Sequence, residues 1–231
     1  MNKIGLVFAM KEELDEVLKC MDKINEYKIF DLDFFECKYN EKECVLVECG
    51  IGKVNAARCS QILIDNLEVD YIINVGVAGG VSEKVSICDI VIADKLIQHD
   101  FDFRPLNYER GFIPQVGDYI LCDDYLLSTA KKIKTDVNTH IGTIASGDIF
   151  VTEEEMSGKI NKNFNALCVE MEGAAIAQTC YLSKVPFLVI RSISDSPSKD
   201  KKNNITFEEF LKTSSKTAAK FILKLIEKID K

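Results

Sequence analysis

The stretch "ALCVEMEGAAIAQTCYL" (residues 166–182) decides the fold, because a strand pattern gives way to a helix pattern within it. Residues 166–171 form a short apolar run typical of a buried strand, and residues 172–182 have the small apolar side chains of a buried helix. Two carboxylates, Glu170 and Glu172, stand at the junction. Acidic side chains favour the first turn of a helix, which explains one glutamate but not both. The pair indicates either a structural ion pair or a polar site at the end of a strand.

The same alternation of strand and helix patterns extends along the whole chain. Apolar periodicity predicts strands at 3–10, 70–80, 89–100, 140–148, 166–171 and 186–195, and helices at 11–21, 55–67, 123–134, 153–161, 172–182 and 207–229. Residues 28–50 are expected to form two or three antiparallel strands that turn at Asn40-Glu41, and residues 101–119 a long functional loop. Since no Pro- or Ser-rich linker interrupts the pattern, we predict a single α/β domain over 1–231, with helices flanking a twisted mixed sheet.

Composition excludes several classes of function. The net charge of −8, without a basic cluster, argues against a nucleic-acid surface, because phosphate binding needs grouped Lys and Arg. Nine cysteines without a CxxC pair, and only two histidines, predict free thiols in a reducing compartment and no metal site. No run approaches the ~20 apolar residues of a membrane span, and the N-terminus has a strand pattern that does not resemble a signal peptide. We therefore expect a cytoplasmic protein that associates with neither nucleic acid nor membrane.

Two glycine-rich segments suggest nucleotide binding at first sight. "GIGK" (50–53) lacks the first glycine of a phosphate-binding loop, where Val47 stands, and has Val54 in place of Ser or Thr. "GVAGG" (76–80) lacks the G-x-G-x-x-G spacing of a dinucleotide site. Both are predicted to be tight strand-to-helix turns whose backbone approaches another group closely.

Carboxylates follow several of the predicted strands. Glu13 stands in "AMKEE", Glu172 in "VEMEG" and Asp195 in "RSISD", and each alone could simply occupy a helix first turn, an N-cap or a loop. Together they suit the cleavage of a glycosidic bond, which needs an acid, a base and a stabiliser of the positively charged sugar. In this hypothesis Asp195 is the acid, Glu13 the base and Glu172 the sugar clamp, while Phe150 stacks on a flat leaving group.

The ordered motifs "GIGKVNAA", "GVAGG", "DIVIAD", "HDFD", "SGDIFV", "VEMEGAAIAQTC", "VPFLVIRSISD" and "TFEEFL" cover nearly the whole chain. In these motifs the chain resembles the 5′-methylthioadenosine/S-adenosylhomocysteine nucleosidases of the purine nucleoside phosphorylase-like superfamily. The resemblance implies a homodimer of single α/β domains. It also implies irreversible hydrolysis of the adenine–ribose bond without metal or cofactor.

The resemblance further implies a role for each site residue. Glu13 would activate water, Asp195 would protonate or hydrogen-bond N7 of adenine, and Glu172 would hold the ribose hydroxyls. Arg191 would orient Glu172 and the water. Phe150 would stack on adenine, and the backbone of Val151 would read its edge. The remaining expected residues are those that line the pocket, Met10, Ile51, Val77, Ala78, Gly79, Met171, Ser194 and Phe207, and those of a loop that closes the partner's site, Phe103, Leu106, Tyr108 and Pro114.

One position departs from the pattern of the family. Many relatives carry Ser where this chain has Val77, so a hydroxyl partner of Asp195 is expected to be lost there. Ser194 or a backbone N–H would then orient the carboxylate. The role of Glu170 stays open between support of the strand end and a structural ion pair.

Three alternative functions belong to the same fold. A phosphorylase would need arginines near the first strand end, but Arg58, Arg104, Arg110 and Arg191 all lie elsewhere in the sequence. A carboxylate there would repel phosphate by about 1–4 kcal/mol at 4 Å. A non-catalytic nucleoside sensor would have no need of Glu13 and Asp195. A futalosine-type hydrolase is poorly separated from a nucleosidase by sequence alone.

Overall fold

The structure is a computed structural model that describes residues 2–195 and 207–230, with the backbone alone at 207–209. The strands are β1 (Lys3–Phe8), β2 (Asp22–Ile29), β3 (Leu32–Tyr39), β4 (Lys42–Glu48), β5 (Tyr71–Gly80), β6 (Ile90–Gln98), β7 (Ile120–Leu121), β8 (Thr139–Ser146), β9 (Ala166–Glu170) and β10 (Phe187–Asp195). The helices are α1 (Lys11–Leu18), α2 (Lys53–Leu67), η1 (Arg104–Leu106), α3 (Asp124–Ala130), α4 (Glu154–Phe164), α5 (Gly173–Ser183) and α6 (Phe207–Lys228). None of the helices in these ranges is long and apolar enough to cross a bilayer.

One mixed sheet runs through the described chain and confirms the predicted α/β class. Its strand order is β10-β6-β8-β9-β5-β1-β4-β3-β2, and an additional β10–β5 pairing closes β5, β10, β6, β8 and β9 into a ring. β5 pairs in parallel with β1 and β10 but antiparallel with β9. The last residues of β5 and β9 therefore meet, with Gly79 opposite Val169, and this meeting point lies beside the candidate site.

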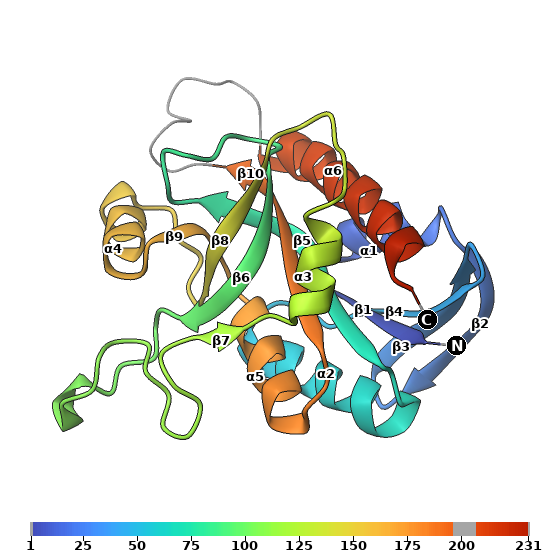
Figure 1. The fold of residues 1–231 in the computed structure, drawn as a ribbon, viewed down its shortest axis with the longest axis horizontal. Coiled ribbons are helices and arrows are strands. Elements are labelled where there is room, and N and C mark those ends of the chain that lie inside the picture. The colour runs from blue at the N-terminus through green and yellow to red at the C-terminus, as the bar shows by residue number, and fades with distance from the viewer. Residues whose placement is uncertain (1, 196–206, 231) are drawn as a thin grey trace.

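Helices cover the sheet on both sides. Figure 1 shows α1 and α6 together on one side, and α2 beside α5 on the opposite side. Three apolar residues of α6, Phe221, Ile222 and Leu225, are buried against the sheet and are at most 1% exposed. Burying each such side chain contributes about 1.5–3 kcal/mol, so this packing holds the two ends of the chain together.

The two glycine-rich segments differ from one another. Gly50 and Gly52 have φ of 83° and 102°, so the segment before α2 is the tight turn that was predicted. The prediction of a turn at "GVAGG" was wrong, because β5 continues through Gly80 and none of its glycines has a left-handed φ. Their backbone has ordinary strand geometry, so glycine is not needed there for a special backbone conformation. Its absence of a side chain instead leaves space for neighbouring groups.

The sequence predicted the N-terminal hairpin strands only in part. The turn at Asn40 and Glu41 is present, with both residues at positive φ. β2, however, begins at Asp22, well before the predicted start at residue 28. Its sequence, DKINEYKI, is mostly exposed at the edge of the sheet, so it lacks the apolar alternation from which a strand is predicted.

Candidate active site

A cavity that opens to solvent lies where β1, β4, β5, β8, β9 and β10 end. It is lined by Ala9, Met10, Glu13, Ile51, Val77, Ala78, Gly79, Ile149, Phe150, Val151, Val169, Glu170, Met171, Glu172, Ser194 and Asp195. Segments from both ends of the sequence therefore meet in one space.

Glu13 is held by the backbone at the start of α1 and the end of β5. One carboxylate oxygen accepts hydrogen bonds from the N–H groups of Ala9 (3.0 Å) and Met10 (3.1 Å), and the other from Val77 (2.9 Å). The bond from Met10 closes a helix cap, so the ordinary role of a first-turn glutamate and a place in the cavity are combined in one residue. Burial raises the pKa of Glu13, although the charge of Arg191 and the three N–H donors lower it.

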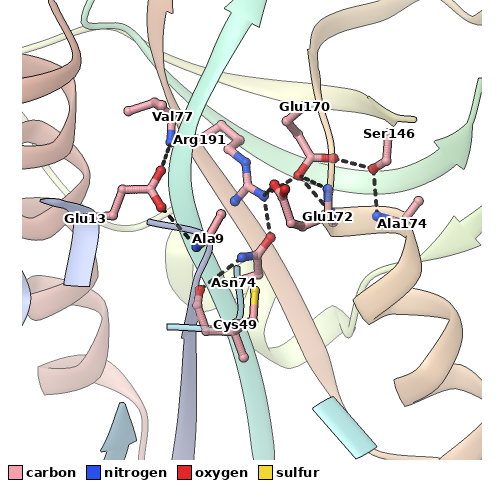
Figure 2. Close-up of polar contacts among 12 residues, drawn as sticks. Ala9, Glu13, Cys49, Asn74, Val77, Ser146, Glu170, Glu172, Ala174 and Arg191 are labelled. Carbon is pink, nitrogen blue, oxygen red and sulfur yellow. Dashed lines mark hydrogen bonds and ion pairs between the residues drawn. The ribbon is translucent and has the colours of Figure 1, made fainter. Parts of the chain in front are cut away.

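A buried network surrounds Arg191 behind the cavity (Figure 2). Its guanidinium donates to Glu170 and to the side-chain oxygen of Asn74, and also to the backbone of Ile190 at 3.1 Å. Glu170 in turn accepts from the hydroxyl of Ser146 and from the N–H groups of Glu172 (3.2 Å) and Gly173 (2.7 Å). Glu170 is thus both the ion-pair partner of Arg191 and a cap for the start of α5, which resolves the role that the sequence left open.

Glu172, the N-cap residue immediately before α5, turns its carboxylate toward the cavity. One oxygen accepts from the N–H of Gly52 at 2.9 Å, and the other lies 3.9 Å from the guanidinium of Arg191. Arg191 therefore makes its direct hydrogen bonds with Glu170, and only a longer ion pair with Glu172, which it was predicted to orient. Burial, with the neighbouring charge of Glu170, raises the pKa of Glu172 to about 7.

Asp195 ends β10 on the other side of the cavity. The hydroxyl of Ser194 donates to its carboxylate at 2.7 Å, which is one of the two alternatives that the sequence predicted for orienting Asp195. Val77 does not stand opposite Asp195 in the sheet: it pairs with Ser192, and Asp195 pairs with Gly79. The backbone N–H of Val77 donates to Glu13 instead, so Val77 lies beside the predicted base.

The mouth of the cavity is apolar. Phe150, 64% exposed, and Ile149 contribute from the loop after β8, and Ile51 from the turn before α2. Asp148 joins these two segments by accepting from the N–H of Lys53 at 2.8 Å. The Lys53 ammonium also binds Asp100 at 2.7 Å, so a partly buried ion pair holds this side of the cavity in place.

Some predicted residues lie away from this cavity. Those of the loop are not part of its lining, and Leu106 and Tyr108 are 59% and 43% exposed. Phe207 starts α6, but its side chain lies outside the described residues. Sequence reasoning did not propose Asn74 or Ser146, although a lone Asn inside the apolar run "YIINVGV" was a detectable signal. In the described ranges, no three His, Cys, Asp or Glu side chains are grouped so that they could hold a metal ion.

Comparison with known proteins places the chain in a family. The model of the phosphorylase superfamily matches residues 3–227. A 5′-methylthioadenosine/S-adenosylhomocysteine nucleosidase from Haemophilus influenzae is 39% identical over 98% of this chain and 100% of its own length. The structure of such a nucleosidase from S. pneumoniae with a transition-state inhibitor is 37% identical, with a TM-score of 0.91 over 99% of this chain and 100% of the other.

A futalosine hydrolase from Helicobacter pylori is also similar, at 33% identity and a TM-score of 0.91 over 99% of this chain and 98% of that one. The similarity to each of these proteins extends over the full fold and includes the segments that form the cavity. The chain therefore belongs to the phosphorylase superfamily, within its 5′-methylthioadenosine/S-adenosylhomocysteine nucleosidase family.

Proposed function

We propose that the protein hydrolyses the N-glycosidic bond of 5′-methylthioadenosine and S-adenosylhomocysteine, releasing adenine and the corresponding 5-thioribose. The observation that carries this proposal is the meeting of Glu13, Glu172 and Asp195 in one cavity. Relatives that carry the nucleosidase name match the chain over nearly its whole length, which supports the substrate class. The whole chain would act as one domain, since strands from both ends of the sequence belong to one sheet.

Glu13 is proposed to remove a proton from the attacking water. A base must be ionised at working pH yet basic enough to accept a proton. Burial makes Glu13 more basic, because it raises the pKa of this carboxyl. The three backbone N–H groups favour the ionised carboxylate and fix it in one orientation. Precise orientation matters because a displacement of about 1 Å can lower the rate ~100-fold.

Asp195 is proposed to stabilise adenine as a leaving group. A carboxyl that donates a proton or hydrogen bond to N7 neutralises the charge that develops as the bond breaks. Ser194 fixes the orientation of this carboxyl, and Phe150 at the cavity mouth offers a flat apolar surface for the purine. The ribose would then lie between Asp195 and Glu13.

Glu172 is proposed to bind the ribose hydroxyls and to stabilise the positive charge of the oxocarbenium-like transition state. Glu13, Glu170 and Glu172 surround the single guanidinium of Arg191, so the ionised cluster carries more negative than positive charge. Positive charge that develops on the sugar ring would offset this excess. The interaction would thus strengthen during the reaction, which is the requirement for catalysis.

Water is proposed as the nucleophile in place of phosphate. No Lys or Arg is among the residues that line the cavity in the described part of the chain. The guanidinium of Arg191 is already engaged by Glu170 and Asn74. A phosphate dianion would therefore meet Glu13 and Glu172 without a free cationic partner, which disfavours phosphorolysis.

The active form is proposed to be a homodimer in the cytoplasm. The loop between β6 and β7 projects from the body of the molecule (Figure 1) and carries a row of stacked rings, with Tyr108 and Phe112 centred 4.5 Å apart. On α2 and α5, Val54 and Leu182 are 78% and 61% exposed, so apolar surface is available for a second copy. All nine cysteines are free thiols, which suits a reducing compartment. Sedimentation equilibrium would give twice the 26.0 kDa chain mass, and a fully active monomer would contradict the dimer.

The decisive experiment is a base-release assay that quantifies the free purine, adenine or hypoxanthine, with a matched pair of variants. Methylthioadenosine, S-adenosylhomocysteine, futalosine and inosine are compared side by side, with and without inorganic phosphate. We expect turnover of the first two substrates without phosphate. Glu13→Gln is expected to lose at least ~100-fold in kcat while still binding adenine. The control, Glu12→Gln, changes an exposed side chain in the same helix turn and is expected to keep the kcat of the wild type.

Each alternative function gives a different result in this assay. Faster turnover of futalosine than of either adenine nucleoside would make the protein a futalosine hydrolase. A rate that depends on phosphate would make it a phosphorylase. Binding of adenine without turnover of any substrate would identify a sensor.

A further inference from the structure

We infer that Gly76 is a positioning residue for the predicted base, because only the absence of a side chain at this position leaves room for the Glu13 carboxylate. A Cβ atom built on Gly76 would lie 2.6 Å from one Glu13 carboxylate oxygen, 3.1 Å from its carbon and 3.3 Å from the other oxygen. All three of the nearest atoms therefore belong to the Glu13 carboxylate. Contacts below 3.0 Å do not occur for real Cβ atoms, so one of the two groups would have to move.

Backbone conformation does not explain this glycine. Gly76 lies inside β5, and its φ is outside the left-handed region in which glycine is favoured. A strand interior ordinarily gains from a side chain, because glycine costs conformational entropy and packs nothing. The glycine is therefore kept for the close approach of another group, and that group is Glu13.

The register of the sheet pairs this glycine with a residue of the buried network behind the cavity. Gly76 is paired with Arg191 on β10, and three residues later Gly79 is paired with Asp195. A Cβ atom on Gly79 would lie 3.3 Å from the Asp195 carboxylate, which is tight but less severe than the contact at Gly76. Two glycines of "GVAGG" thus leave room for the carboxylates of the predicted base and the predicted acid.

A side chain at residue 76 would displace Glu13 and leave the fold intact. The Glu13 carboxylate is at the end of a flexible side chain, so it can rotate away from an added methyl group. Rotation would break the hydrogen bonds from Ala9, Met10 and Val77, which fix its present orientation. The expected consequence is a protein that folds and binds its substrate but activates water poorly.

The test uses Gly76→Ala with Gly158→Ala as its control, because a Cβ atom on Gly158 meets nothing within 4 Å. The catalytic part rests on the proposed function: kcat for methylthioadenosine is expected to fall at least ~100-fold with KM changed less than about threefold. The control variant, Gly158→Ala, is expected to keep the kcat and KM of the wild type. A Gly76→Ala enzyme with kcat within about threefold of the wild type overturns the inference.

A double-mutant cycle of thermal stability tests the close approach of Gly76 and Glu13 itself, independently of any activity. Gly76→Ala is expected to lower the Tm by roughly 3–10 °C in the wild type but not in a Glu13→Ala background, where the carboxylate is absent. An equal loss of Tm in both backgrounds overturns the inference. If Gly76→Ala cannot be purified, recovery of folded protein by adding Glu13→Ala supports the inference, and failure to recover it contradicts it. If the wild type cleaves no nucleoside while the cycle shows the expected coupling, the proposed function fails and the positioning of Glu13 stands.

Discussion

Replacing Glu172 with glutamine is expected to stabilise the protein at alkaline pH while it abolishes turnover. The residue Glu172 is 5% exposed, and burial is the largest cause of its raised pKa, followed by the charge of Glu170. Arg191 and the N–H of Gly52 compensate only in part. A glutamine side chain at this position keeps an oxygen that can accept from Gly52, so the substitution removes the charge and little else.

The magnitude follows from the pKa in the two states. Glu172 titrates near 4.5 when the chain is unfolded and near 7 when it is folded, so the protonated form is the one that favours folding. Its contribution is complete below pH 4.5 and is lost as the pH rises through 7. A shift of this size corresponds to about 3 kcal/mol. For a chain of this length we expect a gain of roughly 6–12 °C in Tm for Glu172→Gln at pH 9.

The assay is thermal unfolding of wild type and variant between pH 5 and pH 9. The difference in Tm is expected to be small at pH 5, just above the pKa of the unfolded chain, and to grow until the pH has passed 7. Glu155→Gln, a change to an exposed side chain, is the control and should show no such gain. A Glu172→Gln protein that is less stable at pH 9, or equally stabilised at pH 5 and pH 9, would refute the reasoning. In parallel, kcat should fall at least ~100-fold, because an amide does not stabilise the charged sugar.

Three further variants test other parts of the site. Glu170→Gln leaves Arg191 buried without its carboxylate partner and should cost about 3 kcal/mol or more in urea unfolding; a cost below about 1 kcal/mol would contradict the buried pair. Ser194→Ala removes the hydroxyl that orients Asp195 and should lower kcat about 10-fold with little effect on KM, whereas unchanged kinetics would show that the hydrogen bond has no role. Lys53→Met breaks the ion pair behind the cavity mouth and should raise KM several-fold with a smaller change in kcat, and a selective loss of kcat would place its effect elsewhere.

Much of the fold could be predicted from local patterns. Strong apolar periodicity located the central strands and the long C-terminal helix, since a buried strand or helix face must be apolar along its length. The exposed edge strand β2 was placed only in part because an edge position does not impose that pattern. The turn expected at "GVAGG" was wrong because glycine was interpreted through conformation, whereas here it provides space beside a carboxylate.

The candidate site could be predicted only as a set of chain segments. Carboxylates after strands are visible in the sequence, and the structure places Glu13, Glu172 and Asp195 around one cavity. Which of them pair with one another depends on the register between strands, which periodicity does not specify. For this reason the partnership of Arg191 with Glu170, and the contribution of Asn74, emerged only from the structure.

The central claim is that this cavity cleaves an adenine nucleoside with water as the nucleophile. It is tested most directly by following methylthioadenosine turnover in water labelled with heavy oxygen, with and without added phosphate. We expect free adenine and methylthioribose that carries one labelled oxygen at its anomeric carbon, at a rate that phosphate does not change. A rate that requires phosphate, with a ribose 1-phosphate as the product and no label incorporated, would contradict the claim.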